Sequence, residues 1–326
     1  LQGHPWFELT WLGASDRSAG KPYREATSWR LDGAMPANVQ NIVVSESKPT
    51  PGAPKIMFSA MDASVATEIE RAFAEAGHFV VSNSKNHRME PDVPLLVPEI
   101  NADHLGILDR QAERGWKGRI VTNPNCSTVA LTMGLAPFKA FGIRRVIATT
   151  MQAVSGAGYP GVASLDILCN VVPYIGGEEE KMQIETQKIL GSFASNALVP
   201  LDARVSAHCN RVPSVDGHLV TVSVELATKV SEADLRAAIE SWSGEPQKQN
   251  LPSAPARPLQ YMPEQDRPQP RRDAERDRGM AAFMGRLREC PVLDWKFIVL
   301  AHNTIRGAAG VAVLNAETMV ARGIIR

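Results

Sequence analysis

Short apolar runs alternate with helical segments through the first 125 residues, and this alternation constrains the fold more than any other feature. The segment at 62–77 carries apolar residues at helical spacing with Asp62 as a candidate N-cap, and residues 103–114 predict a second helix. Strands are predicted for the apolar runs at residues 7–15, 55–60, 78–83, 94–100 and 118–124. Strands that alternate with helices predict a parallel, doubly wound sheet that binds ligands beyond the carboxyl ends of its strands.

The pattern changes in the second half of the chain. Residues 144–156 and 218–227 alternate as half-buried strands do, whereas residues 178–190 and 231–244 predict helices. This mixture predicts a second, α+β domain with a largely antiparallel sheet.

Two later segments have their own character. Residues 252–278 are rich in proline and charge and predict a long loop, either solvated or reaching a partner subunit. Residues 294–317 predict a strand, a turn and a helix of small residues.

The charge balance of the 326-residue chain excludes broad classes of partner. Lys+Arg and Asp+Glu both number 35, so no net field draws the chain to nucleic acid or to an anionic membrane. No run of 18 apolar residues occurs, so no membrane span is predicted. The four cysteines are scattered, with no CxxC pair and no metal-ligand spacing. We therefore expect reduced thiols in a cytoplasmic setting and no metal site.

One cysteine lies at a corner in the stretch "NPNCSTVALTMGL". Asn123, Pro124 and Asn125 are turn formers, and a buried helix is predicted from Ser127 onward. Cys126 would therefore lie at the helix N-terminus, where unpaired backbone N–H groups favour a thiolate and lower the pKa of the thiol. The segment allows two interpretations, a nucleophile or a small core residue.

Two other stretches offer groups to a cleft. In "RVPSVDGH", His218 opens a strand behind a tight turn and could serve as a base for a thiol or a water molecule, or be structural. In "TTMQAVSGAGYPG", a glycine-rich turn follows a strand and would let the backbone approach a ligand, with Gln152 nearby.

Candidate anion-binding groups occur in three places. Ser15, Arg17 and Ser18 follow the first strand and suit a cofactor 2′-phosphate, although Asp16 is a mixed signal and an ordinary polar turn is the alternative. Arg88 and Lys181 could each hold an anion or simply be solvated.

Together these stretches resemble the aspartate-semialdehyde dehydrogenase family, specifically its archaeal and fungal-like branch. The matching motifs cover nearly the whole chain and are, in order, "LGASDRSAGKPY", "FSA", "SNSKNHRMEPDVPLLVPEIN", "NPNCST", "TMQAVSGAGYPG", "GGEEEK", "HCNRVPSVDGH" and "HNTIRGAAG". The resemblance implies a homodimeric or homotetrameric enzyme that uses NADPH to convert β-aspartyl phosphate to aspartate β-semialdehyde through a cysteine thioester. That product feeds lysine, threonine, methionine and isoleucine synthesis.

The resemblance also implies a role for each matching residue. The catalytic set would be Cys126 as nucleophile, His218 as acid/base and Gln152 as an orienting group. The substrate set would be Arg211 for the carboxylate, Glu178 for the amino group, and Lys181, Arg88 and Asn125 for the phosphate. The cofactor set would be Ser15, Arg17, Ser18, Ser59, Ala60, Ser155, Gly156 and Asn303, the last three near the nicotinamide.

The fold implied is a Rossmann-like, doubly wound dinucleotide-binding domain over residues 1–126 and 305–326, joined to an α+β substrate and dimerisation domain over residues 127–304. The chain departs from the family at its start, since no glycine-rich pyrophosphate loop precedes residue 7. We expect an upstream piece to have been removed and cofactor binding to be weak.

Three alternatives are kept open. One is an acyl-thioester reductase like malonyl-CoA reductase, and another is a truncated, non-catalytic paralogue that acts as a binding or scaffold protein. N-acetyl-glutamyl-phosphate reductase, which shares the chemistry, fits the motifs less well.

Overall fold

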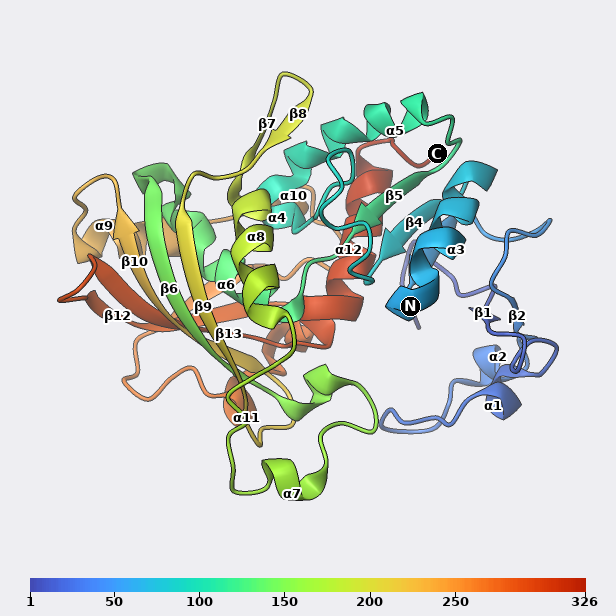
Figure 1. Ribbon diagram of the computed structural model, residues 1–326, viewed down its shortest axis with the longest axis horizontal. Coiled ribbons are helices and arrows are strands. Elements are labelled where there is room, and N and C mark those ends of the chain that lie inside the picture. Colours follow the sequence, from blue (N-terminus) through green and yellow to red (C-terminus); the bar gives the residue numbers. More distant parts are fainter.

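The computed structural model describes residues 1–326, and two β-sheets of different character organise it (Figure 1). A small parallel sheet lies in the N-terminal part, and a six-stranded, mostly antiparallel sheet lies in the C-terminal part. None of the helices combines the length and the apolar character that a membrane crossing requires.

The small sheet consists of β3 (Ile56–Ser59), β4 (Phe79–Ser82) and β5 (Arg119–Thr122), parallel and in that order. These strands confirm three of the predicted apolar runs. Helix α3 (Ala63–Ala76) confirms the predicted helix between them. Asp62 caps it by accepting the N–H of Ser64 at 2.8 Å, and Gly77 ends it with a left-handed φ of 110°.

Two predicted strands of this part are wrong in extent. Of residues 7–15, only β1 (Gly13–Ala14) pairs, with β2 (Ser45–Glu46). Of residues 94–100, only Leu95 forms a bridge to β5, and the chain then turns into the short helix α4 (Pro98–Asn101). For residues 94–100 the physical reason is proline, which has no N–H to donate within a central strand but suits the first turn of a helix.

The remaining elements of this part are short helices. The predicted helix over 103–114 is split into the 3-10 helix η1 (Ala102–Leu108) and α5 (Asp109–Glu113). Helices α1 (Tyr23–Ala26) and α2 (Ala37–Gln40) lie at the far edge of the molecule (Figure 1). The C-terminal helix α12 (Gly310–Ala321) returns to pack its small residues against β4 and β5.

The large sheet has the strand order β11-β12-β13-β10-β6-β9. Its bounds are β6 (Ile143–Gln152), β9 (Arg204–Arg211), β10 (His218–Leu226), β11 (Leu259–Met262), β12 (Ala282–Glu289) and β13 (Trp295–Ala301). The pairs β6/β9 and β11/β12 are parallel, and the other pairs are antiparallel. The predicted α+β character is therefore confirmed, and so are the strands predicted over residues 144–156 and 218–227.

Helix α6 (Cys126–Leu135) lies on the large sheet and forms the centre of the main core. Nine of its ten residues are buried, which explains why its sequence is apolar on every side rather than on one stripe. Gly134 permits the close approach, because a Cβ there would lie 3.0 Å from the ring of Phe297 on β13. Helices α8 (Glu178–Leu190) and α9 (Glu232–Ser241) confirm the other two predicted helices, and α9 begins with a capping box at Ser231.

The prediction of one long loop over residues 252–278 is wrong. This segment contributes β11 to the edge of the sheet, the short helix α11 (Pro270–Asp273) and much of the 3-10 helix η4 (Arg276–Gly279). The polar composition of this segment gave no indication of the four-residue strand β11, which pairs with β12 from farther along the chain. After β13 the chain forms the π-helix η5 (Ile305–Ala309) and continues into α12, as the predicted strand, turn and helix require.

Smaller elements complete the chain. They are α7 (Ser164–Ile167), β7 (Ser192–Ala194), β8 (Ala197–Val199), α10 (Glu245–Lys248) and the 3-10 helices η2 (Ala136–Phe141) and η3 (Val154–Ala157).

Candidate active site

Strand register brings three predicted site residues to one end of the large sheet. Gln152 ends β6 and is paired with Arg211, which ends the parallel strand β9. His218 begins β10, which runs antiparallel to β6, and is paired with Ala301 at the end of β13. Residues that are far apart in sequence therefore meet at this end of the sheet, where helix α6 also begins.

Asn125 and Cys126 form the turn at the start of α6. The side-chain oxygen of Asn125 accepts the N–H groups of Ser127 at 3.0 Å and Thr128 at 3.3 Å, which makes Asn125 the N-cap. Cys126 is the first helical residue, and its Sγ lies 3.1 Å from Nε2 of His218. The position predicted for Cys126 is thus confirmed, and the thiol has an imidazole as its direct partner.

The orientation of the imidazole is fixed by the backbone. Ala153 donates its N–H to Nδ1 of His218 at 3.1 Å, so the neutral ring carries its proton on Nε2, facing the sulfur. Burial, followed by the charges of Arg211 and His302, lowers the pKa of His218 to about 3. At neutral pH the ring is therefore uncharged and presents a hydrogen-bond donor to Cys126.

The expected lowering of the pKa of Cys126 is wrong. Burial, and then the negative charge of Glu178, raise the pKa of the thiol to about 12. The charges of Arg88 and Arg211 and the N–H of Ser127 oppose this shift but do not overcome it. The sequence indicated the helix N-terminus, but it gave no measure of how completely the fold would remove the thiol from water.

Helix α8 directs an acid and a base toward the N-cap of α6. One carboxylate oxygen of Glu178 accepts Nδ2 of Asn125 at 2.7 Å, and the other accepts Nζ of Lys181 at 3.1 Å. The acidic cluster at the start of α8 also suits the helix N-terminus electrostatically. Glu178, Lys181 and Asn125 are therefore brought together beside Cys126.

A second acid on α8, Glu185, belongs to the same cluster and was missed by sequence reasoning. Its Oε1 accepts Nη1 of Arg88 at 2.9 Å, and its Oε2 accepts the backbone N–H of Asn125 at 2.7 Å. The available signal was helical spacing, because Glu185 follows Glu178 by seven residues and so lies on the same face of the predicted helix.

Arg211 lies at the end of β9, beside Ala153 and Gly156. Its Nη1 donates to the carbonyl of Ala153 at 2.9 Å, and burial lowers the pKa of its guanidinium. Gly156 provides the space for it, since a Cβ at this glycine would lie 2.9 Å both from Nη1 of Arg211 and from Cε1 of His218. Gly156 thus abuts the catalytic candidates themselves.

The side chain of Gln152 is not hydrogen-bonded to Cys126. Its Nε2 donates to the hydroxyl of Thr150, two residues back on the same face of β6, at 3.3 Å. Its backbone lies at the edge of the site, but its amide is directed along the strand.

Asn303 and Ser155 brace the turn that leads into His218. Asn303 accepts the N–H of Gly217 at 2.8 Å and donates Nδ2 to the hydroxyl of Ser155 at 2.8 Å. Both predicted cofactor residues are therefore beside the turn that precedes His218.

A buried ion pair supports the segment that faces the nucleophile, and it too was missed by sequence reasoning. Glu99 on α4 receives two hydrogen bonds from Arg306 on η5, at 2.8 and 2.6 Å, with both side chains fully buried. The adjacent Gly307 packs on Cys126, because a Cβ there would lie only 2.7 Å from Cβ of the cysteine.

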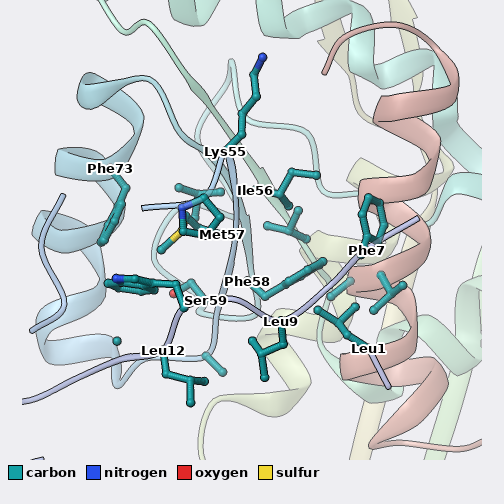
Figure 2. Close-up of a pocket in the computed structure, with 18 of the residues that line it drawn as sticks. Leu1, Phe7, Leu9, Leu12, Lys55, Ile56, Met57, Phe58, Ser59 and Phe73 are labelled. Atoms are coloured by element: carbon teal, nitrogen blue, oxygen red, sulfur yellow. The ribbon is translucent and has the colours of Figure 1, made fainter. Parts of the chain in front are cut away.

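A cavity of about 760 Å³ lies along the open edge of β3 and contains two of the predicted cofactor residues. Figure 2 shows Phe7 and Leu9 of the unpaired N-terminal segment beside Phe58 of β3, and Met57 of the same strand on the side of Phe73. Ser59 and Ala60 line this cavity. The hydroxyl of Ser59 already donates to the buried Glu70 at 2.6 Å, and its carbonyl accepts the N–H of Asn83 at 2.8 Å.

The turn predicted to bind a 2′-phosphate has free donors. The backbone carbonyl of Ser15 accepts a hydrogen bond from the N–H of Ser18 at 3.0 Å, which folds the segment into a tight turn. The side chains of Ser15, Arg17 and Ser18 make no hydrogen bonds within the protein, and Arg17 is exposed. Two hydroxyls and a free guanidinium in one turn fit a phosphate dianion.

Comparison with known proteins agrees with this architecture. Residues 1–107 match the family model "Semialdehyde dehydrogenase, NAD binding domain", and residues 135–306 match "Semialdehyde dehydrogenase, dimerisation domain". Aspartate-semialdehyde dehydrogenase of Methanothermobacter thermautotrophicus is 50% identical over 97% of this chain and 92% of that protein. The enzyme of the same name from Schizosaccharomyces pombe is 46% identical over 100% of this chain and 94% of that protein.

A solved structure gives the same result. The crystal structure of aspartate semialdehyde dehydrogenase with NADP from Candida albicans has a TM-score of 0.92 and 42% identity, covering 99% of this chain and 94% of that one. The predicted two-part fold is thereby confirmed. These names favour the semialdehyde activity over the malonyl-CoA and non-catalytic alternatives.

Proposed function

The chain belongs to the aspartate-semialdehyde dehydrogenase family, and from this premise we propose that it converts β-aspartyl phosphate and NADPH to aspartate β-semialdehyde, phosphate and NADP. The observation that carries the proposal is the 3.1 Å contact between Sγ of Cys126 and Nε2 of His218 at the start of α6. A thiol beside an imidazole and a set of helix N–H groups is the arrangement that acyl transfer through a thioester requires.

The substrate itself completes the activation of Cys126. Glu178 is the second cause of the raised thiol pKa, and a substrate ammonium bound to Glu178 would cancel its charge. The thiol proton then leaves with the phosphate that the sulfur displaces. A carbonyl carbon is now bound to Cys126 as a thioester.

Reduction and release follow on the same sulfur. NADPH would supply the hydride for the thioester carbon. The carbonyl re-forms as the carbon–sulfur bond breaks, and Nε2–H of His218 donates a hydrogen bond to the leaving thiolate and stabilises it. The thiolate then takes up a proton from solvent, which restores the thiol, so the acid side of the role predicted for His218 is limited to hydrogen-bond donation. The base half would require the ring proton on Nδ1, where the N–H of Ala153 opposes it.

The positively charged groups near the thiol divide the substrate's two anions between them. Arg211 suits the carboxylate because a guanidinium binds it with two parallel hydrogen bonds. Arg88 and Lys181, with the amide of Asn125, are assigned to the phosphate. Gln152 keeps an orienting role in this proposal only if its amide turns away from Thr150 when substrate binds.

NADP is the cofactor, and we assign its 2′-phosphate to the free donors of Ser15, Arg17 and Ser18. Ser59 and Ala60 would line its path, and Ser155, Gly156 and Asn303 would lie near the nicotinamide. The assigned residues thus extend from an exposed phosphate site to the buried imidazole.

We also propose that the chain forms a homodimer or homotetramer in the cytoplasm. Support for self-association comes from the dimerisation-domain match and from the excursion around α7. This excursion exposes five large apolar side chains, Tyr159, Leu165, Leu168, Val171 and Tyr174. The compartment is a prediction from the scattered cysteines alone.

Steady-state assays test the proposed reaction. Aspartate semialdehyde, phosphate and NADP should produce NADPH, whereas malonyl-CoA with NADPH should give no turnover. Cys126→Ser should abolish activity without changing the melting temperature by more than a few degrees, because a hydroxyl is a much weaker nucleophile at neutral pH. An active Cys126→Ser variant would refute the proposal. So would a wild-type enzyme that turns over malonyl-CoA but not aspartate semialdehyde.

A further inference from the structure

Glu185 connects two parts of the site that are separate in sequence. Its two carboxylate oxygens divide between Arg88, from the loop after β4, and the backbone N–H of Asn125, which immediately precedes the nucleophile. Both distances, 2.9 and 2.7 Å, are those of well-formed charge-assisted bonds. The side chain is 2% exposed, so water does not compete for either oxygen.

The contact with Arg88 determines which of its donors remain available. Nη1 is held by Glu185, and Nη2 donates to the carbonyl of Asn83 at 2.8 Å. Nε is buried and has no partner within the protein. Since a buried donor without a partner is costly, this nitrogen is suited to meet a ligand oxygen.

The contact with Asn125 determines where the sulfur lies. Asn125 is held at its side-chain amide by Glu178, at its own N–H by Glu185, and at Oδ1 by the first N–H groups of α6. Its φ and ψ, and with them the direction of the next residue, are therefore fixed jointly by α8 and by the first turn of α6.

We propose that Glu185 is a positioning residue that sets the distance between the anion-binding Nε of Arg88 and the thiol of Cys126. The inference rests on the proposed function for the nature of the anion, phosphate. A carboxylate is required because two separate donors need two acceptor oxygens. Glutamine has one such oxygen, and its NH₂ would have to face either a guanidinium or an N–H.

The test is Glu185→Gln, with Glu180→Gln as its control. Glu180 is on the same helix and loses the same charge, but it is exposed and contacts no site residue. In the semialdehyde-oxidising assay, the KM for phosphate should rise about tenfold in Glu185→Gln, whereas the KM for aspartate semialdehyde should stay within threefold. The control should resemble the wild type in both.

A second readout does not depend on turnover. Loss of Glu185 leaves the charge of Arg88 uncompensated near Cys126, so the pH midpoint for alkylation of Cys126 by iodoacetamide should shift downward by about one unit. A purely structural role would lower the melting temperature and kcat without moving this midpoint. If the wild type has no activity on aspartate semialdehyde, the proposed function fails. The pH profile of Cys126 alkylation still tests the positioning role of Glu185 in that case.

The proposal is overturned if Glu185→Gln folds and shows both an unchanged alkylation midpoint and a phosphate KM within twofold of the wild type. If Glu185→Gln does not fold, Glu185→Asp decides by the same two measurements. Aspartate keeps the charge but is one methylene shorter and cannot reach both donors, so it should raise the phosphate KM while leaving the midpoint in place. Wild-type values for both quantities in Glu185→Asp would equally overturn the proposal.

Discussion

At the scale of single residues, the resting site holds its nucleophile as a neutral thiol. Burial and Glu178 raise the pKa of Cys126, and the imidazole beside it is itself uncharged. A cysteine kept protonated until substrate arrives is protected from oxidation and from stray electrophiles, because the thiolate is the reactive form.

Glu178→Gln should lower the pKa of Cys126. Glutamine can still accept Nδ2 of Asn125, but it removes the negative charge that opposes ionisation of the thiol. Alkylation of Cys126 at pH 8 should become several-fold faster, while turnover falls because the substrate ammonium has lost its partner. Mass spectrometry of the labelled peptide measures the first effect. Equal labelling rates in Glu178→Gln and in the exposed control Glu180→Gln would contradict this account of the pKa.

Gly307 is a second residue whose size matters more than its chemistry. Gly307→Ala would place a methyl group 2.7 Å from Cβ of Cys126, and neither the buried Arg306 beside it nor helix α6 has room to move. We expect a destabilisation of about 1–3 kcal/mol from overpacking. A displaced sulfur should also reduce kcat by about tenfold or more.

Gly176→Ala is the matched control for Gly307→Ala, since its nearest neighbour would be Tyr174 at 3.9 Å. Chemical unfolding and steady-state rates measure the two effects. A Gly307→Ala enzyme with both wild-type stability and wild-type kcat would show that η5 does not confine the nucleophile.

At the scale of elements, the turn after β1 should determine which cofactor is preferred. Arg17→Ala removes one charge-assisted hydrogen bond to a 2′-phosphate, worth about 1.5–3 kcal/mol. The preference for NADP over NAD should therefore fall by about ten- to a hundredfold, with NAD binding little changed. Fluorescence titration with each cofactor measures it, and Arg24→Ala on the nearby α1 is the control. An undiminished NADP preference would remove Arg17 from the cofactor site.

A local sequence pattern predicts an element reliably only when the signals for that element lie within its own segment. Helix α3 was predicted correctly because its cap, its periodicity and its terminal glycine all lie within the segment itself. Strand β11 was missed because four residues in a polar, proline-rich stretch carry no local signal, and their strand character comes from pairing with β12.

At the scale of the whole molecule, buried neutral histidines should make the fold sensitive to acid. Burial lowers the pKa of His104 to about 4 and that of His218 to about 3, whereas an unfolded histidine titrates near 6.5. Between these values the unfolded state binds more protons, so the free energy of unfolding should rise with pH from about 4 to 6.5 and be lost as pH falls.

His104→Gln should flatten this pH dependence of stability. At pH 5 the buried His104 costs the folded state about 2 kcal/mol relative to neutral pH, and glutamine does not titrate. Urea unfolding at pH 5 and pH 7 gives the difference, with the exposed His208→Gln as control. The test is the change in the free energy of unfolding between pH 5 and pH 7, rather than the absolute stability. An identical change in wild type and His104→Gln would contradict the role assigned to His104.

The sequence by itself determined the order of most elements, the position of Cys126 at a helix start and the family. Each of these depends on residues that are neighbours in the chain or on motifs that can be matched in order. Only the tertiary structure decided that the thiol is buried and neutral, that Ala153 fixes the proton of His218, and that Glu185 and the Glu99–Arg306 pair hold the site. The physical reason is that desolvation and hydrogen bonding depend on groups brought together from distant strands and helices, and local sequence carries no record of those distances.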